Sequence, residues 1–204
     1  MGFAQAKHYW TVEEYLAFEK TSVIRHEYVS GQIYAMAGGS KNHSRIADDL
    51  GATLNRAFAQ EEKECEAFTS DVKVHINSEV YYYSDVVVAC EELSEDEEEN
   101  EYIAENPVLL AEVLSKRTQR TDRIEKMREY QFLPSLREYL IIEQTRYQVE
   151  VYRHTKAGEE WQKEVYTDPK QQVFLASINT NFTLAEIYAR VRFGATTEGE
   201  EREN

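Results

Sequence analysis

The sequence predicts an α/β protein in which helices flank a mixed central sheet to form an αβ sandwich. Its 204 residues, of which 42% are hydrophobic and 12% aromatic, suit a globular domain with a single buried core. Segments with helical and with strand-like spacing of apolar residues follow one another, and neither an internal repeat nor a Gly/Ser linker divides them. We therefore predict one domain over residues 1–195 and a disordered acidic tail over residues 196–204.

The first part of the chain predicts a helix, a hairpin and a second helix. The segment "TVEEYLAFEK" (11–20) begins with the Thr and Glu spacing of a capping box, which opens a short helix. The two β-prone runs of "EYVSGQIYAMAG" (27–38) meet at a Ser-Gly pair, which predicts a hairpin. Apolar residues then recur at helical spacing from Lys41 to Gln60, so we expect a long amphipathic helix there.

The middle of the chain predicts three strands. The segments "CEAFTSDVKVHI" (65–76) and "VYYYSDVVVAC" (80–90) are rich in the β-branched and aromatic residues that strands favour. The segment "PVLLAEVLS" (107–115) is apolar on both faces, as expected of a strand in the middle of a covered sheet.

The last part predicts two helices with strands between them. One helix covers Thr121–Phe132 and ends near Pro134, because proline disfavours helix continuation, and the other covers residues 183–191. Four further strands complete the sheet, at residues 137–143, 147–154, 160–167 and 172–177.

The charge of the chain argues against simple binding to nucleic acid. The net charge is −15 and the pI is near 4.8, whereas phosphate binding is driven by Lys and Arg. Much of this charge lies in residues 91–107 and 196–204. We interpret these runs as a solvated loop and a frayed end; the alternative is an acidic surface that mimics nucleic acid.

No segment predicts a membrane span or a signal peptide, so we predict a cytoplasmic protein. The two cysteines, Cys65 and Cys90, lack the spacing of metal ligands. We interpret both as buried small apolar residues rather than as a disulfide.

Asp85 and Glu112 are carboxylates set within apolar strands. Because side chains alternate along a strand, Asp85 shares a face with Val87, and Glu112 shares a face with Leu110. An ionised carboxylate among such residues needs a cation or a full set of hydrogen-bond donors. If the two strands are neighbours, both acids converge on one point.

Two converging carboxylates are suitable ligands for Mg²⁺ or Mn²⁺, which prefer oxygen ligands and keep several waters. The carbonyl of Val113 could also reach such a metal. The ion would polarise a phosphoryl oxygen and activate a bound water. The alternative is that both acids pair with Lys and Arg or point to solvent at a sheet edge.

Two lysines are candidates to act beside these acids. Asp122, Lys126 and Tyr130 form one stripe of the helix after Glu112, and Lys126 could swing back to hold the attacking water or the scissile phosphate. The alternative for Lys126 is an ordinary surface salt bridge. Lys73 lies on a neighbouring strand, where it is either a second candidate or an exposed edge residue.

His43 lies on the inward stripe of the long helix and so faces the core or the site. It is either a packed histidine, a partner of a metal ligand, or a phosphate contact. The three successive tyrosines at 81–83 favour sheet packing over base stacking.

Four segments in this order resemble the Uma-type putative restriction endonuclease family of cyanobacteria, within the PD-(D/E)XK nuclease superfamily. They are "HEYVSGQIYAMAGGSKNHSRIADDLGATL", "YYYSDVVV", "LLAEVLSKRTQRTDRIEKMREY" and "LREYLIIEQ", and the resemblance covers about residues 8–155. It implies a restriction-endonuclease-like fold and a Mg²⁺-dependent endonuclease that hydrolyses DNA. It also implies a homodimer, because two active sites cut two strands.

The resemblance implies a role for each candidate residue. Asp85 and Glu112 match the two metal-binding acids, Lys126 matches a lysine carried on the helix, and Glu27 matches an additional acid ahead of the core. The sequence departs from the superfamily pattern at Ser84, where a proline is usual, and at Leu114, where the strand lysine is usual. Catalysis would therefore depend on Lys126.

Three functions remain open from the sequence. The first is DNA hydrolysis with Mg²⁺ or Mn²⁺. The second is a degenerate relative that binds a partner protein or nucleic acid without cleavage. The third is a metal-dependent hydrolase of smaller phosphoesters. No cluster of base-reading residues predicts a recognition sequence.

Overall fold

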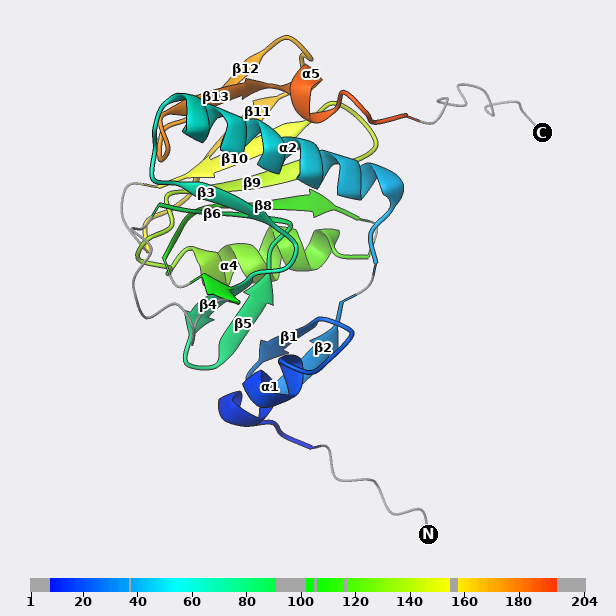
Figure 1. Ribbon diagram of the computed structural model, residues 1–204, viewed down its shortest axis with the longest axis vertical. Helices are drawn as coiled ribbons and strands as arrows, with labels where there is room; N and C mark the ends of the chain where they lie inside the picture. Colours follow the sequence, from blue (N-terminus) through cyan, green and yellow to red (C-terminus); the bar gives the residue numbers. More distant parts are fainter. Residues whose placement is uncertain are drawn as a thin grey trace, which may run out of the picture.

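The computed structural model describes residues 8–36, 38–90, 102–104, 106–115, 117–154 and 158–193. Helices and mixed sheets form a layered α/β structure, which confirms the predicted class (Figure 1). None of the described helices is long and apolar enough to cross a membrane. Most of the acidic run 91–107 and the tail 196–204 lie outside the described residues.

The larger sheet has six strands in the order β11-β10-β9-β8-β6-β3. β8 and β9 pair in parallel, and the other neighbours pair antiparallel. The predicted central strand 107–115 is confirmed as β8. The bounds are β3 (Glu66–Thr69), β6 (Val86–Ala89), β8 (Pro107–Leu114), β9 (Glu138–Glu143), β10 (Val149–Arg153) and β11 (Gln162–Tyr166).

The second sheet has five strands in the order β2-β1-β5-β4-β7. The predicted hairpin is confirmed: β1 and β2 are joined at Ser30 and Gly31, whose φ angles of 46° and 80° fit a tight turn. The bounds are β1 (His26–Val29), β2 (Gln32–Ala35), β4 (Lys73–Asn77), β5 (Val80–Tyr83) and β7 (Ile103–Ala104).

The predicted helices are present with small changes. α1 (Val12–Glu19) begins with the expected capping box, and α2 (Lys41–Gln60) has the predicted bounds. The predicted helix 121–132 consists of η1 (Thr121–Lys126), which has the wide i→i+5 turns of a π-helix, and α4 (Met127–Tyr130). The closing helix is shorter than expected, with α5 covering Leu184–Ile187.

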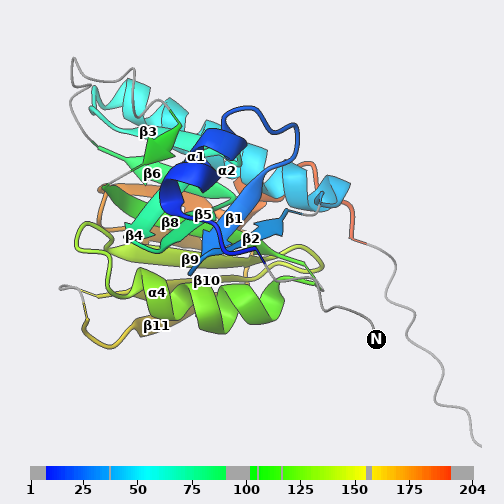
Figure 2. The ribbon, with the colours of Figure 1, turned by 90° about the horizontal axis from the view of Figure 1, so that it is seen from below.

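Helices cover both faces of the six-stranded sheet (Figure 1). Alternate residues of β8 divide between them: Leu109, Ala111 and Val113 pack with α2, whereas Leu110 and Leu114 pack on the opposite face with α4, β4 and β5. A third apolar cluster joins α1 to β1 and β5, and α1 lies across these strands (Figure 2). The end of β8 thus lies between α2 on one side and η1 on the other.

The prediction of one continuous strand in each of two segments was wrong. Segment 65–76 divides into β3 and β4, and segment 80–90 divides into β5 and β6, with each half in a different sheet. Ser70 has a φ of 60°, which turns the chain after β3. Asp85 therefore lies at the bend between β5 and β6 and not in the middle of a strand.

The prediction that the strand at 172–177 belongs to the central sheet was wrong. Its residues form β12 (Gln172–Leu175), which pairs with β13 (Thr180–Thr183) in a separate hairpin. β13 was not expected from the sequence.

The interpretation of the cysteines was also wrong, because Cys65 and Cys90 form a disulfide. Antiparallel pairing of β3 with β6 places Glu66 opposite Ala89, so the next residues outward face each other. Neighbouring strands, and not spacing along the chain, bring the two thiols together.

Candidate active site

Asp85 and Glu112 come from neighbouring strands, as the sequence analysis expected. β6 pairs antiparallel with β8, and Val86 lies opposite Ala111. Continuing this register by one residue places Asp85 opposite Glu112. Ser84, just before the acid, donates from Oγ to the Ala111 carbonyl at 2.9 Å, which ties the bend to β8.

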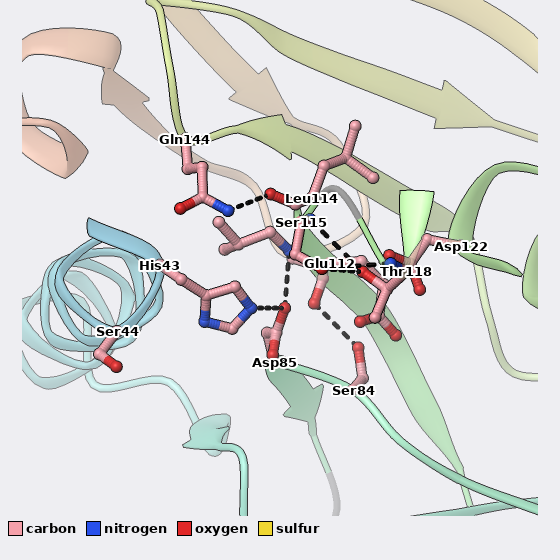
Figure 3. Close-up of polar contacts among 12 residues, drawn as sticks. His43, Ser44, Ser84, Asp85, Glu112, Leu114, Ser115, Thr118, Asp122 and Gln144 are labelled. Carbon is pink, nitrogen blue, oxygen red and sulfur yellow. Dashed lines mark hydrogen bonds and ion pairs between the residues drawn. The ribbon is translucent and has the colours of Figure 1, made fainter. Parts of the chain in front are cut away.

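The carboxylate of Asp85 is held through one of its oxygens (Figure 3). Oδ2 accepts the Val113 backbone N–H at 2.7 Å and lies 3.1 Å from Nε2 of His43. Within the part of the chain that the structure describes, Oδ1 accepts no hydrogen bond.

Glu112 is 4% exposed and is likewise bound through one oxygen. Its Oε1 lies 2.9 Å from Nζ of Lys126 and accepts the Tyr130 hydroxyl at 3.2 Å. Its Oε2 has no hydrogen-bond donor among the described residues. One oxygen of each acid is therefore available for a further ligand.

Lys126 is the cation at the centre of these acids. It is 5% exposed, so its interpretation as a surface salt bridge is wrong. Nζ lies 2.9 Å from Glu27 Oε1, 2.9 Å from Glu112 Oε1 and 2.9 Å from the Tyr83 carbonyl. Asp122 is more distant, with Oδ1 at 3.9 Å. The lysine enters from η1, and wide π-helical turns are frequent at functional sites.

The site holds more negative than positive charge. Burial raises the pKa of Glu112 well above its usual value, and Asp122 and Asp85 add to this, while Lys126 opposes it. Burial also raises the pKa of Asp122 to about 6. Burial lowers the pKa of Lys126, but Glu112, Glu27 and Asp122 outweigh it, so that the lysine stays charged. An added cation would relieve the repulsion among these carboxylates.

The donor set is compatible with a hard divalent cation. Mg²⁺ commonly takes one or two protein carboxylates and completes its shell with water and substrate phosphate. Asp85 Oδ1 and Glu112 Oε2 are oxygens of that kind. A cluster of three or more His, Cys, Asp or Glu side chains suited to a metal does not occur among the described residues, so water and substrate would have to supply most ligands.

Of the other residues considered from the sequence, His43 contacts a candidate acid, whereas Lys73 and the tyrosines 81–83 are buried. His43 lies at the site and contacts the carboxylate of Asp85 through Nε2, so it is not simply a packed histidine. Lys73 is buried, which excludes the edge interpretation. Its Nζ lies 3.5 Å from the Tyr83 hydroxyl, and among the described residues it forms no ion pair with a candidate acid. Tyrosines 81–83 are all buried, as expected for packing.

Sequence reasoning missed part of the site. Asp122 and Tyr130 were recognised only as neighbours of Lys126 on one helical stripe, yet both are buried beside Glu112. That stripe was the signal that could have identified them. Gln144, which donates to the Leu114 carbonyl at 2.6 Å, gave no signal because its role depends on a contact between distant segments.

Comparison of the sequence with models of protein families gives a match over most of the chain. The model of the Uma2 family, described as "Putative restriction endonuclease", matches residues 12–186. The chain belongs to the Uma2 family. The expected resemblance is thereby confirmed, and the candidate acids and Lys126 all fall within the matched Uma2 region.

Two relatives of this Uma2 chain come from Synechocystis sp. (strain ATCC 27184 / PCC 6803 / Kazusa). The protein slr1290 is 36% identical over 182 residues, which cover 89% of this chain and 92% of the relative. The protein sll1609 is 36% identical over 144 residues, which cover 70% of this chain and 80% of the relative.

A solved structure has a fold similar to that of this Uma2 chain. A crystal structure from Anabaena variabilis ATCC 29413, described as a putative nuclease belonging to DUF820, aligns with a TM-score of 0.68 and 19% identity. The alignment covers 90% of this chain and 99% of that one. It confirms the restriction-endonuclease-like architecture.

Proposed function

We propose that this Uma2 protein is a Mg²⁺- or Mn²⁺-dependent endonuclease that hydrolyses phosphodiester bonds in DNA. One observation carries the proposal: Lys126 reaches Glu112 from a helix, at 2.9 Å, beside Asp85. The strand position of the usual lysine is Leu114, and Lys126 supplies the missing cation from another element. Membership of the Uma2 family and the nuclease-like fold support the same reaction class.

The metal would be held by Asp85, Glu112 and the Val113 carbonyl. A divalent cation held there would supply polarisation of a phosphoryl oxygen and a lower pKa for a coordinated water. Lys126 contributes a fixed positive charge that stabilises the negative charge developing on the phosphate. Glu27 assists by holding Nζ of Lys126 at 2.9 Å, the same distance as Glu112.

Two observations favour a second candidate, a nuclease-fold protein that binds a partner protein or nucleic acid without cleavage. The three hydrogen-bond acceptors around Lys126 use all the N–H groups of an ammonium, and the net charge of −15 opposes DNA. With these three acceptors in place, Lys126 acts on a bound phosphate through its charge and donates no further hydrogen bond.

DNA is the proposed partner and substrate, and a homodimer is the proposed assembly, because two sites would cut two strands. We propose a cytoplasmic location, where a DNA substrate is present. Disulfides are rare in the cytosol, so the Cys65–Cys90 pair is expected to be reduced there.

The decisive experiment is cleavage of supercoiled plasmid with Mg²⁺ or Mn²⁺, and with EDTA as the metal-free control. We expect Asp85→Ala to lower the rate at least ~100-fold with an unchanged circular dichroism spectrum. The matched control is Asp71→Ala, since the Asp71 side chain is 81% exposed. It should retain the rate of the original protein.

The other outcomes distinguish the remaining functions. Binding of Mn²⁺ by calorimetry without cleavage of any DNA would support the non-cleaving candidate. Turnover of a small phosphodiester such as bis-p-nitrophenyl phosphate, with no cleavage of DNA, would indicate a hydrolase of smaller substrates. Either result would overturn the endonuclease proposal.

A further inference from the structure

His43 makes a direct contact with a proposed metal ligand from an element that supplies none. Its Nε2 lies 3.1 Å from Asp85 Oδ2, the oxygen that also accepts the Val113 N–H at 2.7 Å. Figure 3 shows the ring projecting from α2 toward Asp85, whereas Ser44, the next residue, points away. The imidazole therefore faces the carboxylate and not the core.

Close approach of the Gly39 backbone restricts the position of the His43 ring on the side away from Asp85. A Cβ on Gly39 would lie 2.6 Å from Nδ1 of His43 and 2.9 Å from its Cγ, so only glycine leaves room for the ring in this orientation. This close approach places one edge of the imidazole against backbone and the other against Asp85.

The start of α2 is also tied to the end of β8. Ser40 caps the helix by accepting the His43 N–H at 3.1 Å, and its Oγ donates to Gln144 Oε1. Gln144 in turn donates from Nε2 to the Leu114 carbonyl at 2.6 Å, two residues beyond Glu112. The helix that carries His43 is thereby fixed to the strand that carries the second acid.

We propose that His43 is a positioning residue for Asp85: together with the Val113 N–H it occupies Oδ2 and so directs Oδ1 toward the metal. This inference rests on the proposed metal-dependent function. A histidine that only packed would not need an acidic partner, whereas Nε2 of His43 lies 3.1 Å from Asp85 Oδ2. Partners that orient metal ligands in this way commonly set metal affinity.

The test compares Mn²⁺ binding by calorimetry in three variants. His43→Ala removes the hydrogen bond and should weaken Mn²⁺ binding about 10- to 100-fold. His43→Gln places an amide N–H near the position of Nε2 and should restore binding to within about 3-fold of the original protein. Gly39→Ala keeps His43 but displaces its ring, and should resemble His43→Ala.

Ser44→Ala is the matched control, because Ser44 is exposed on the same helix and points away from the site. It should bind Mn²⁺ as the original protein does. Thermal unfolding of every variant reports whether it folds; should His43→Ala not fold, His43→Gln and Gly39→Ala carry the comparison alone.

The outcomes separate this inference from the proposed function. If the original protein binds Mn²⁺ and His43→Ala binds equally well, the positioning role is overturned while the metal site stands. If His43→Gln binds as weakly as His43→Ala, the hydrogen bond is not what matters, and the inference is again overturned. If the original protein does not bind Mn²⁺, the proposed function falls and the inference falls with it.

Discussion

Asp122 is a buried carboxylate whose charge the site balances only in part. Burial raises its pKa from 3.8 to about 6, against the opposing effects of Lys126 and the Thr118 hydroxyl. A carboxyl group with a raised pKa in the folded state stabilises the fold at low pH and loses that contribution as pH rises through the folded value. The difference corresponds to about 3 kcal/mol.

We predict that Asp122→Asn is more stable than the original protein at pH 8, by about 1 to 3 kcal/mol, and no more stable near pH 4. The reason is that asparagine resembles the protonated acid and carries no charge to bury. Denaturant unfolding in EDTA across this pH range measures the difference. Asp71→Asn, at an exposed position, should show no such trend, and a pH-independent effect of Asp122→Asn would contradict the prediction.

Much of the candidate site could be predicted residue by residue. A carboxylate within an apolar, strand-like segment of sequence is conspicuous, which is why Asp85 and Glu112 were chosen as candidates without a structure, although Asp85 lies at a bend between two strands. Lys126 was found from its helical stripe and the family resemblance. The contact between His43 and Gly39 could not be predicted, because it depends on the distance between a ring and a backbone atom.

Helices were easier to predict than strands because their signals are local. The bounds of α2 follow from its periodic apolar stripe and its Ser40 cap. The two long strand-like segments concealed their breaks, because both halves remain apolar while the chain passes from one sheet to the other. Such a transfer depends on which strands pair at long range, and a local pattern does not encode that.

Asn55 joins α2 to the exposed edge of the larger sheet. Its Oδ1 accepts the Ala67 N–H at 2.7 Å and its Nδ2 donates to the Ala67 carbonyl at 2.8 Å. Ala67 lies in β3, an edge strand, where free backbone groups could pair with another chain. The side chain therefore occupies the outward-facing backbone N–H and C=O of Ala67 on this edge.

We predict that Asn55→Ala lowers the free energy of unfolding by about 1 to 3 kcal/mol, since two backbone groups lose their partner. Arg56→Ala is the control on the same helix, at an exposed position, and should change it by no more than about 0.5 kcal/mol. Urea unfolding measures both. Equal effects of the two variants would show that the contact does not stabilise the edge.

The whole molecule is organised so that both sheets meet at the candidate site. Glu27 and Tyr83 come from the five-stranded sheet, Glu112 from the six-stranded sheet, and Lys126 bonds to all three. A site of this kind requires the relative placement of the sheets to be stable. Long-range links between strands therefore matter to function as well as to stability.

The Cys65–Cys90 disulfide joins β3 to β6, two neighbouring strands of the six-stranded sheet, across a sequence separation of 25 residues. Closing a loop of this length in the unfolded chain stabilises the fold by about 3 kcal/mol.

We predict that Cys65→Ser lowers the free energy of unfolding by about that amount in oxidising buffer. In dithiothreitol the variant and the original protein should have nearly equal stability, because the original has then lost the same bond. Thiol alkylation followed by mass spectrometry verifies the state of the cysteines in each buffer. If Cys65→Ser were equally destabilised in both buffers, the loss would arise from packing of the side chain and not from the covalent link.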